Sequence, residues 1–284
     1  MPDGSVVLVE IERGTLSRVT ARGAIEVIAD LGGGPNGAAI GPDGRCYVCN
    51  NGGFAWHRVG DLLYPGDKPD DYSGGRIEAV DMKTGAVEVL YTDCGGHPLN
   101  GPNDIVFDRG GGMYFTDLGK SYGRVQDRGA VFYAQPDGSG IREIVFPLIT
   151  PNGISLSPDE NFLYVAETMP ARIHAFAIKE PGVLERRLPT EECLASPAGY
   201  QYFDSMAVDD AGHVCVATII HGGITRVSPD GSQIEHFATD DPLTTNVCFG
   251  GDGLRTAFVT LSSTGRLVKG TWPTSGLKLN FLNT

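Results

Sequence analysis

Five short segments carry an Asn or Asp at an equivalent point, directly before an apolar run that should form a strand. None places a Cys or His at that point. Hard oxygen donors suit Ca²⁺, Mg²⁺ or Mn²⁺ better than Zn²⁺. The pattern therefore indicates a site for one divalent cation, with Ca²⁺ the favoured ion and Mn²⁺, Mg²⁺, Zn²⁺ and Fe²⁺ as alternatives. The segments are Pro35-Asn36-Gly37, Pro102-Asn103-Asp104, Pro151-Asn152-Gly153, Phe203-Asp204-Ser205 and Thr245-Asn246-Val247.

A second row of oxygen-bearing side chains stands at the ends of other apolar runs: Glu10, Asn50, Asp117 and Glu167. Asn and Asp are also good turn residues, because they bond their own backbone ahead of a strand. That interpretation stays open for any single position. It does not explain why the same point is used five times, and so the whole set favours a binding site.

The elements that would position these groups form a repeat. A tight polar turn followed by a short apolar run recurs six times, which is a hairpin signal. The turns and runs are Pro2–Gly4 into Val6–Glu10, Pro42–Gly44 into Cys46–Asn50, Arg109–Gly112 into Met113–Asp117, Pro158–Glu160 into Phe162–Glu167, Asp209–Gly212 into Val214–Thr218, and Gly251–Gly253 into Thr256–Thr260.

A third run follows each copy, and a fourth follows most of them, as at Ala24–Ala29, Ala86–Tyr91, Ile141–Phe146 and Leu277–Leu282. Four strands repeated six times predict an all-β fold, a six-bladed β-propeller with four-stranded antiparallel blades around a central channel. We expect one domain over residues 1–284. An inner strand would run down the channel and the next would return, so that both rows of oxygen-bearing residues meet on one face.

The amino-acid composition limits the classes of molecule that the protein could bind. The 284 residues carry a formal net charge of −13 and dispersed acidic groups, which argues against nucleic acid and membranes and suits cations and neutral polar ligands. Six scattered cysteines predict reduced, buried thiols and a cytoplasmic protein. The stretch 51–73, rich in Gly, Pro, Asp and aromatics, predicts a long loop. It would be a lid that covers substrate with Phe54, Trp56 and Tyr64, or an inert excursion.

Three stretches carry a family resemblance: Asn100–Asp117 (NGPNDIVFDRGGGMYFTD), Thr150–Glu167 (TPNGISLSPDENFLYVAE) and Phe203–Gly212 (FDSMAVDDAG). They resemble the SMP-30/gluconolactonase/LRE family, whose members are six-bladed propellers with a divalent metal on the axis. Many of those members hydrolyse sugar lactones. The resemblance implies that Asn152 and Asp204 are metal ligands, that Asn103 is a further ligand or a substrate contact, and that Asp104 faces substrate.

The sequence departs from the family pattern at two places. Gly101 occupies a position where an Arg often contacts substrate. The family also supplies a Glu ligand at the start of the first inner strand, whereas Met1 already lies in the turn after that strand. We expect either that the natural chain starts upstream and supplies this ligand, which is the preferred interpretation, or that Glu10 replaces it.

The expected function is metal-dependent hydrolysis of a small, sugar-type lactone by water activated at the metal, with Asp204 accepting the proton. Asn36, Asp104, Asp117 and Asn246 would bind the substrate. The alternatives are a metal-dependent phosphotriesterase, a strictosidine-synthase-like propeller and, from another class, a non-catalytic ligand-binding propeller.

Overall fold

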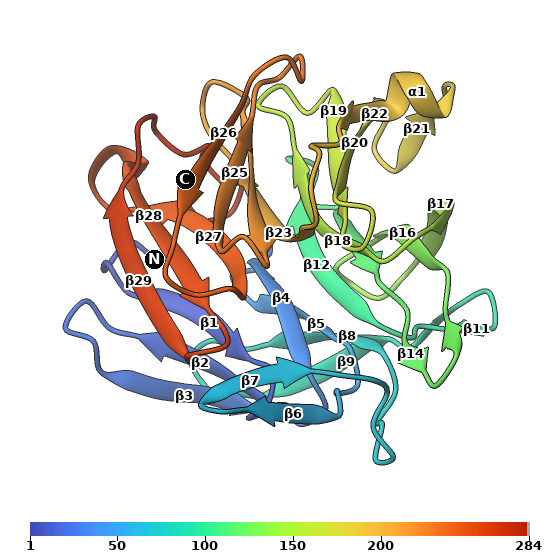
Figure 1. Cartoon of the computed structure of the whole chain (residues 1–284). Helices are drawn as coiled ribbons and strands as arrows, with labels where there is room; N and C mark the ends of the chain where they lie inside the picture. The colour runs from blue at the N-terminus through green and yellow to red at the C-terminus, as the bar shows by residue number, and fades with distance from the viewer. Residues whose placement is uncertain (283–284) are drawn as a thin grey trace. The chain divides into compact units, whose positions relative to one another are not determined.

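The computed structural model describes residues 1–282, which divide into two compact units (Figure 1). Unit 1 comprises residues 1–57, 65–148 and the C-terminal end from residue 279, and unit 2 comprises residues 58–64 and 149–278. Unit 1 contains three antiparallel sheets. They are β1 (Val6–Glu10), β2 (Thr15–Val19) and β3 (Ile25–Asp30); β4 (Pro35–Ile40), β5 (Cys46–Asn50), β8 (Arg76–Val80) and β9 (Val87–Tyr91); and β12 (Pro102–Phe107), β13 (Met113–Asp117), β16 (Gly129–Ala134) and β17 (Ile141–Leu148).

Unit 2 also contains three antiparallel sheets, with a short helix α1 (Pro189–Glu192) and a 3₁₀ turn η1 (Asp252–Leu254). The sheets are β18 (Pro151–Leu156), β19 (Phe162–Glu167) and β20 (Arg172–Glu180) with β21 (Val183–Glu185) and β22 (Cys193–Ala195); β23 (Tyr202–Val208), β24 (Val214–Ile219), β25 (Gly223–Val227) and β26 (Ile234–Ala238); and β27 (Thr244–Gly250), β28 (Thr256–Leu261) and β29 (Arg266–Thr271).

These sheets are the blades of a six-bladed β-propeller, and all six predicted turn-and-strand repeats are confirmed. The predicted strand at Leu277–Leu282 is wrong. This segment makes no strand, although Gly276 just before it forms an isolated bridge with Asp209, and the Leu277 amide donates to the Val208 carbonyl. The β27–β29 sheet therefore has three strands within residues 1–282, where four were expected. The β1–β3 sheet also has three strands.

The repeated turns fold for a common reason. Asp43, Asp159 and Asp209 each accept a hydrogen bond from the backbone N–H two residues later, at 3.1 Å in all three. Gly44 follows Asp43 with a φ of +79°, in the left-handed region where a side chain is disfavoured. Each turn thus reverses the chain between an inner strand and the next strand outward.

Burial increases toward the middle strands of the blades. Every residue of β5 and β13 is buried, whereas every residue of β1 is half-buried. In unit 1, Tyr47, Phe107 and Phe115 belong to one buried cluster, and in unit 2, Phe203 and Ile173 belong to another. Apolar burial of this extent is the main favourable contribution to folding.

The predicted loop 51–73 is partly structured. Within it, β6 (Trp56–Val59) and β7 (Leu62–Pro65) pair as a hairpin. Two further pairs of short strands occur: β10 (Asp93–Cys94) with β11 (His97–Pro98), between β9 and β12, and β14 (Ser121–Tyr122) with β15 (Val125–Gln126), between β13 and β16. All six cysteines are free, as predicted, but the prediction that all are buried is wrong. Cys46, Cys49 and Cys215 are buried, whereas Cys94 and Cys193 are half-buried and Cys248 is exposed. Over residues 1–282, no helix is long and apolar enough to cross a membrane.

Candidate active site

The candidate residues lie in a β-bulge at the start of an inner strand. In β12, Pro102 pairs with Asp117 and Ile105 pairs with Phe115, so that two residues, Asn103 and Asp104, stand opposite one. The same two-to-one count occurs at the starts of β4, β18 and β23. A bulge leaves the extra residue outside the regular ladder and redirects its side chain, and bulges are common beside active sites.

The fifth predicted position differs from the other four. In β27, Thr244 pairs with Leu261 and Asn246 pairs with Thr260, which makes Thr245 the extra residue. Asn246 Oδ1 accepts a hydrogen bond from the Val247 amide at 2.7 Å. Asn246 therefore occupies a regular ladder position, and the equivalence seen in the sequence holds structurally for four strands.

Unit 1 brings Asn36, Asn103 and Asp104 together. A Cβ atom on Gly37 would lie 2.4 Å from the Asn103 carbonyl oxygen and 2.6 Å from the Asp104 Cα, so β4 and β12 approach closely because residue 37 is glycine. Asn103 is 3% exposed, and its Oδ1 is buried without a hydrogen-bond partner. The Asp104 amide donates to Thr116 Oγ1 at 3.1 Å, which fixes the bulge.

Unit 2 brings Asn152 and Asp204 together in the same way. A Cβ atom on Gly153 would lie 2.6 Å from the Asp204 carbonyl oxygen, so β18 and β23 are also in close contact. Asn152 is 4% exposed and donates through Nδ2 to Thr168 Oγ1 at 3.0 Å. The half-buried Asp204 accepts the Ser205 amide on Oδ1 at 3.0 Å.

The second row, at the ends of the second strands, holds the loops that enter the inner strands. Asp117 accepts the amides of Asn100 (2.8 Å), Gly101 (2.7 Å) and Gly119 (2.9 Å). Burial raises the pKa of Asp117, and these N–H groups partly offset the effect. Both carboxylate oxygens are thus engaged by backbone groups, and the contacts found for Asp117, which was predicted to bind substrate, position the loop before Asn103.

Glu167 and Asn50 also accept loop N–H groups, whereas Glu10 accepts only side-chain donors. Glu167 accepts the Ile149 amide at 2.6 Å and also pairs with Arg172 and His174. Burial opposes the ionised form of Glu167, but these hydrogen bonds hold its pKa below the usual range.

Asn50 accepts the Gly34 amide at 2.9 Å and thereby holds the loop before Asn36. Glu10, the predicted conditional fourth ligand, receives Arg13 Nη1 at 2.7 Å and the hydroxyls of Ser17 (2.5 Å) and Thr15 (3.2 Å). Its carboxylate is therefore engaged in an ion pair and two hydroxyl contacts.

Lys120 is a buried charge that the sequence pattern did not single out. Its Nζ donates to Asn51 Oδ1 at 3.1 Å and to the Gly53 carbonyl at 2.6 Å, and it lies 3.9 Å from the centre of the Phe54 ring. Burial lowers the pKa of Lys120 to about 7, against the attraction of Asp117. This residue ties the loop 51–73 to the segment after β13. A lysine between glycine and serine gives no sequence signal of such burial.

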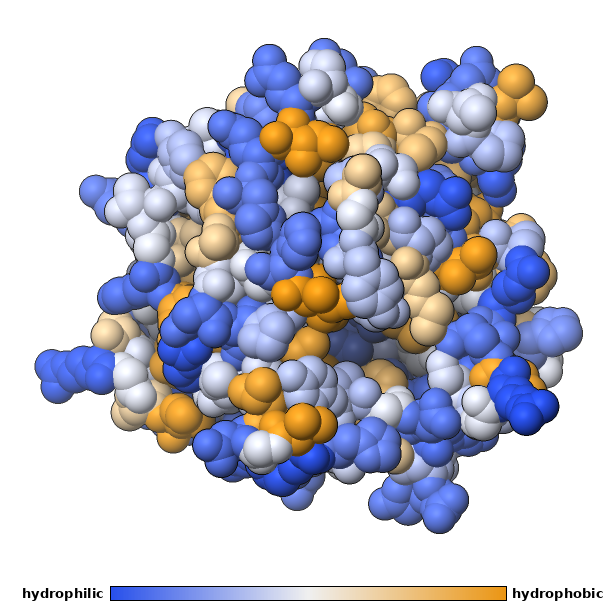
Figure 2. Space-filling view, viewed as in Figure 1, coloured by the Kyte–Doolittle hydropathy of each residue, from blue (hydrophilic) through white to orange (hydrophobic). Residues whose placement is uncertain are grey.

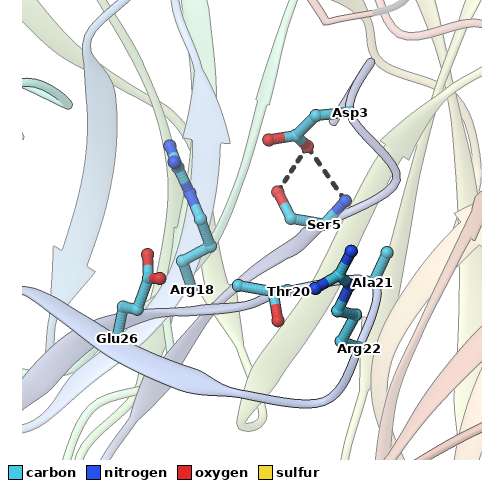
Figure 3. A pocket seen from close by; sticks show the side chains of 7 residues that line it. All are labelled: Asp3, Ser5, Arg18, Thr20, Ala21, Arg22 and Glu26. Atoms are coloured by element: carbon cyan, nitrogen blue, oxygen red, sulfur yellow. Dashed lines mark hydrogen bonds between the residues drawn. The ribbon is translucent and has the colours of Figure 1, made fainter.

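A surface hollow of about 400 Å³ lies elsewhere in unit 1 (Figure 3). It is lined by Asp3, Ser5, Arg18, Thr20, Ala21, Arg22 and Glu26. Asp3 accepts both the amide and the hydroxyl of Ser5, and two arginines balance two acids. Val6, next to this hollow, pairs with Val19, whereas Glu10 pairs with Thr15 at the other end of the sheet. The hollow therefore contains none of the candidate residues.

The candidate donors fit a hard cation through amide oxygens together with the carboxylate of Asp204. Among residues 1–282, no group of three or more His, Cys, Asp and Glu side chains could hold a metal ion. The candidate set consists of asparagine amides and the single carboxylate of Asp204, so it is not a group of that kind. A buried amide oxygen with no donor, as at Asn103, costs about 1–3 kcal/mol, and a cation would satisfy it.

Comparison with known proteins assigns the chain to a family. Residues 1–263 match the model of the SMP-30/gluconolactonase/LRE-like region. The chain belongs to this family. The resemblance inferred from the three sequence stretches is thereby confirmed.

Two curated relatives and one solved structure are similar to this chain. A gluconolactonase of Zymomonas mobilis is 30% identical over 248 residues, covering 81% of this chain and 61% of the relative. The lactonase drp35 of Staphylococcus saprophyticus is 28% identical over 233 residues, covering 81% of this chain and 65% of the relative. The chain thus spans less than two thirds of either. The calcium-binding protein regucalcin from Agrobacterium tumefaciens shares the fold, with a TM-score of 0.75 at 18% identity over 100% of this chain and 90% of that one.

Proposed function

We propose that the protein hydrolyses small lactones with the help of one divalent cation, held in unit 2 by Asn152 and Asp204. The observation that carries this proposal is the pairing of an amide and a carboxylate in matching bulges of β18 and β23, which approach closely at Gly153. Asn103 stays a candidate third ligand from the sequence. Ca²⁺ remains the favoured ion, because the donors are all oxygens.

The family supports the type of reaction. Both curated relatives described above are named as lactonases. A lactone is a cyclic ester, and its opening needs a proton acceptor for water and stabilisation of the negative charge that develops on the carbonyl oxygen. A half-buried carboxylate beside a buried amide offers the first of these directly.

Asp204 and Asn152 have different roles in the proposed reaction. Asp204 accepts the proton of the water that attacks the carbonyl carbon. Asn152 is held in place by Thr168 and fixes the position of the pair. A bound divalent cation would polarise the lactone carbonyl as a Lewis acid. In unit 1, Asn36 lies beside Asn103 and Asp104 because β4 and β12 approach closely at Gly37.

One experiment tests this proposal. Protein passed through a chelator is assayed with a panel of aldonolactones and a phosphotriester, with and without added Ca²⁺, Mn²⁺ or Fe²⁺. We expect lactone hydrolysis that is lost on chelation and restored by one of the ions. Turnover that does not need metal, or none on any lactone, would refute the proposal. Activity on the phosphotriester alone would favour the phosphotriesterase alternative.

A further inference from the structure

Exposed apolar side chains gather on the loops that carry Asn152 and Asp204. Figure 2 shows that hydrophobic residues are interspersed with hydrophilic ones over the surface, so a local concentration is notable. Four large apolar residues of unit 2 lie on these loops or beside them, and they are Ile149 (41% exposed), Met169 (50%), Tyr200 (72%) and Ile220 (38%). Leaving such groups in water costs free energy unless something covers them.

Hydrogen bonds show that the first three lie around the candidate ligands. The Met169 amide donates to Thr150 Oγ1 at 3.0 Å, two residues before Asn152. Thr168 accepts the Asn152 side chain on its hydroxyl and the Phe203 amide on its carbonyl at 3.2 Å. Met169 therefore stands where the loops entering β18 and β23 meet. Ile149 precedes the first of these loops, and Tyr200 lies in the second.

Tyr200 and Ile220 are each held by specific contacts. Tyr200 packs edge-on against Tyr202, with ring centres 5.5 Å apart and hydroxyls 3.0 Å apart. Ile220 follows Ile219, which pairs with Tyr202, and its amide donates to the Pro242 carbonyl at 2.7 Å. Ile220 has a φ of +79°, which is costly for a β-branched residue. Such strain is typically retained at functional positions.

We infer that Met169, Tyr200, Ile149 and Ile220 form an apolar rim that binds a hydrocarbon substituent of the lactone. This inference rests on the proposed function and adds its substrate class, namely lactones that carry an alkyl or aryl group on the ring. A fully hydroxylated sugar lactone would present only polar groups to this rim and would gain nothing from it. The rim contributes to binding whether or not the ester is hydrolysed.

The test compares two lactones with the same ring, δ-valerolactone and δ-decalactone, which differ by a pentyl group. Each buried methylene is worth about fourfold in affinity. With about two of the five buried, we expect at least a tenfold higher kcat/KM and a tenfold tighter calorimetric binding for δ-decalactone. Met169→Ser and Tyr200→Ser should each reduce this ratio at least threefold.

Two control variants separate the rim from general surface effects. Tyr200→Phe keeps the ring and removes the hydroxyl, so the ratio should stay within twofold. Ile234→Ser, on the exposed outer strand β26, should also leave it unchanged. Equal binding of both lactones, or a ratio insensitive to Met169→Ser and Tyr200→Ser, would overturn the inference. Tight binding of δ-decalactone without hydrolysis would instead refute only the proposed function.

Discussion

Two rows of oxygen-bearing residues lie on the first two strands of the blades, and their contacts differ. Asp117 and Glu167 of the second row each pair with the proline just before a first-row bulge. The first row stands in bulges at the starts of the inner strands, as at Asn103, Asn152 and Asp204. The second row ends the neighbouring strands, as at Asp117 and Glu167, and accepts backbone N–H groups from the loops that enter the first row. We propose that the bulged residues of the first row bind the cation and substrate and that the second row positions the loops, because only the bulged residues lie outside the regular ladder.

The largest effect should come from the first row. Asp204→Asn removes the proton acceptor while preserving the shape of the side chain. We expect kcat on a lactone to fall by about 10³-fold or more, since general-base catalysis contributes about 10²–10⁴-fold, with a midpoint of urea unfolding close to that of the wild type. Full activity in this variant would exclude Asp204 from catalysis and break the contrast between the rows.

Substitutions in the second row should lower the free energy of unfolding. Glu167→Gln leaves Arg172 and the buried His174 without their anionic partner, and we expect a loss of about 3 kcal/mol in the free energy of unfolding. Glu185→Gln is the matched control, because the exposed pair of Glu185 with Arg187 contributes about 0.5 kcal/mol or less. Urea titration measures both. If Glu167→Gln lowered kcat as much as Asp204→Asn without loss of stability, the two rows would not differ as described.

The close approach of the inner strands offers an intermediate test. Gly153→Ala would place a Cβ atom 2.6 Å from the Asp204 carbonyl oxygen, and β18 and β23 would have to separate. We expect a loss of about 1–2 kcal/mol in stability together with weaker metal binding. Gly140→Ala, where no atom lies within 4 Å, is the control. Metal affinity unchanged in Gly153→Ala would show that the pairing of Asn152 with Asp204 does not depend on this contact.

Lys120 should give the smallest effect, visible as a pH dependence. Its pKa of about 7 lies below the ordinary value of 10.5, so the unfolded chain binds more protons between these two values. The free energy of unfolding of the wild type should therefore rise with pH across this window, relative to Lys120→Met, which lacks the group. Urea midpoints at pH 7 and pH 9.5 measure the difference. The exposed Lys83→Met should instead parallel the wild type.

The repeat made much of the fold predictable. Turns rich in Asp and Gly, such as those at Asp43 and Asp209, bond their own backbone and need no distant partner, so the six turns could be identified from local sequence. Leu277–Leu282 has the apolar character of a strand, but the Leu277 amide bonds to Val208 in another blade. Whether this segment forms a strand depends on tertiary contacts, which cannot be identified from local sequence patterns.

The candidate site was predictable in position and less so in role. The Pro-Asn and Phe-Asp pairs indicated the points where bulges form. The role of Asp117 depends on which N–H groups the folded loop presents, and the burial of Lys120 depends on a loop almost 70 residues earlier in the chain. Neither has a signature within a few residues of sequence.

Metal affinity compared between the two rows tests the central claim most directly. Calorimetric titration of chelated protein with Ca²⁺ or Mn²⁺ would compare the wild type, Asp204→Asn and Glu10→Gln. We expect Asp204→Asn to weaken binding at least tenfold, and Glu10→Gln, whose carboxylate already pairs with Arg13, to bind as the wild type does. Wild-type affinity in Asp204→Asn, or loss of binding in Glu10→Gln, would contradict the assignment of the cation to the bulges.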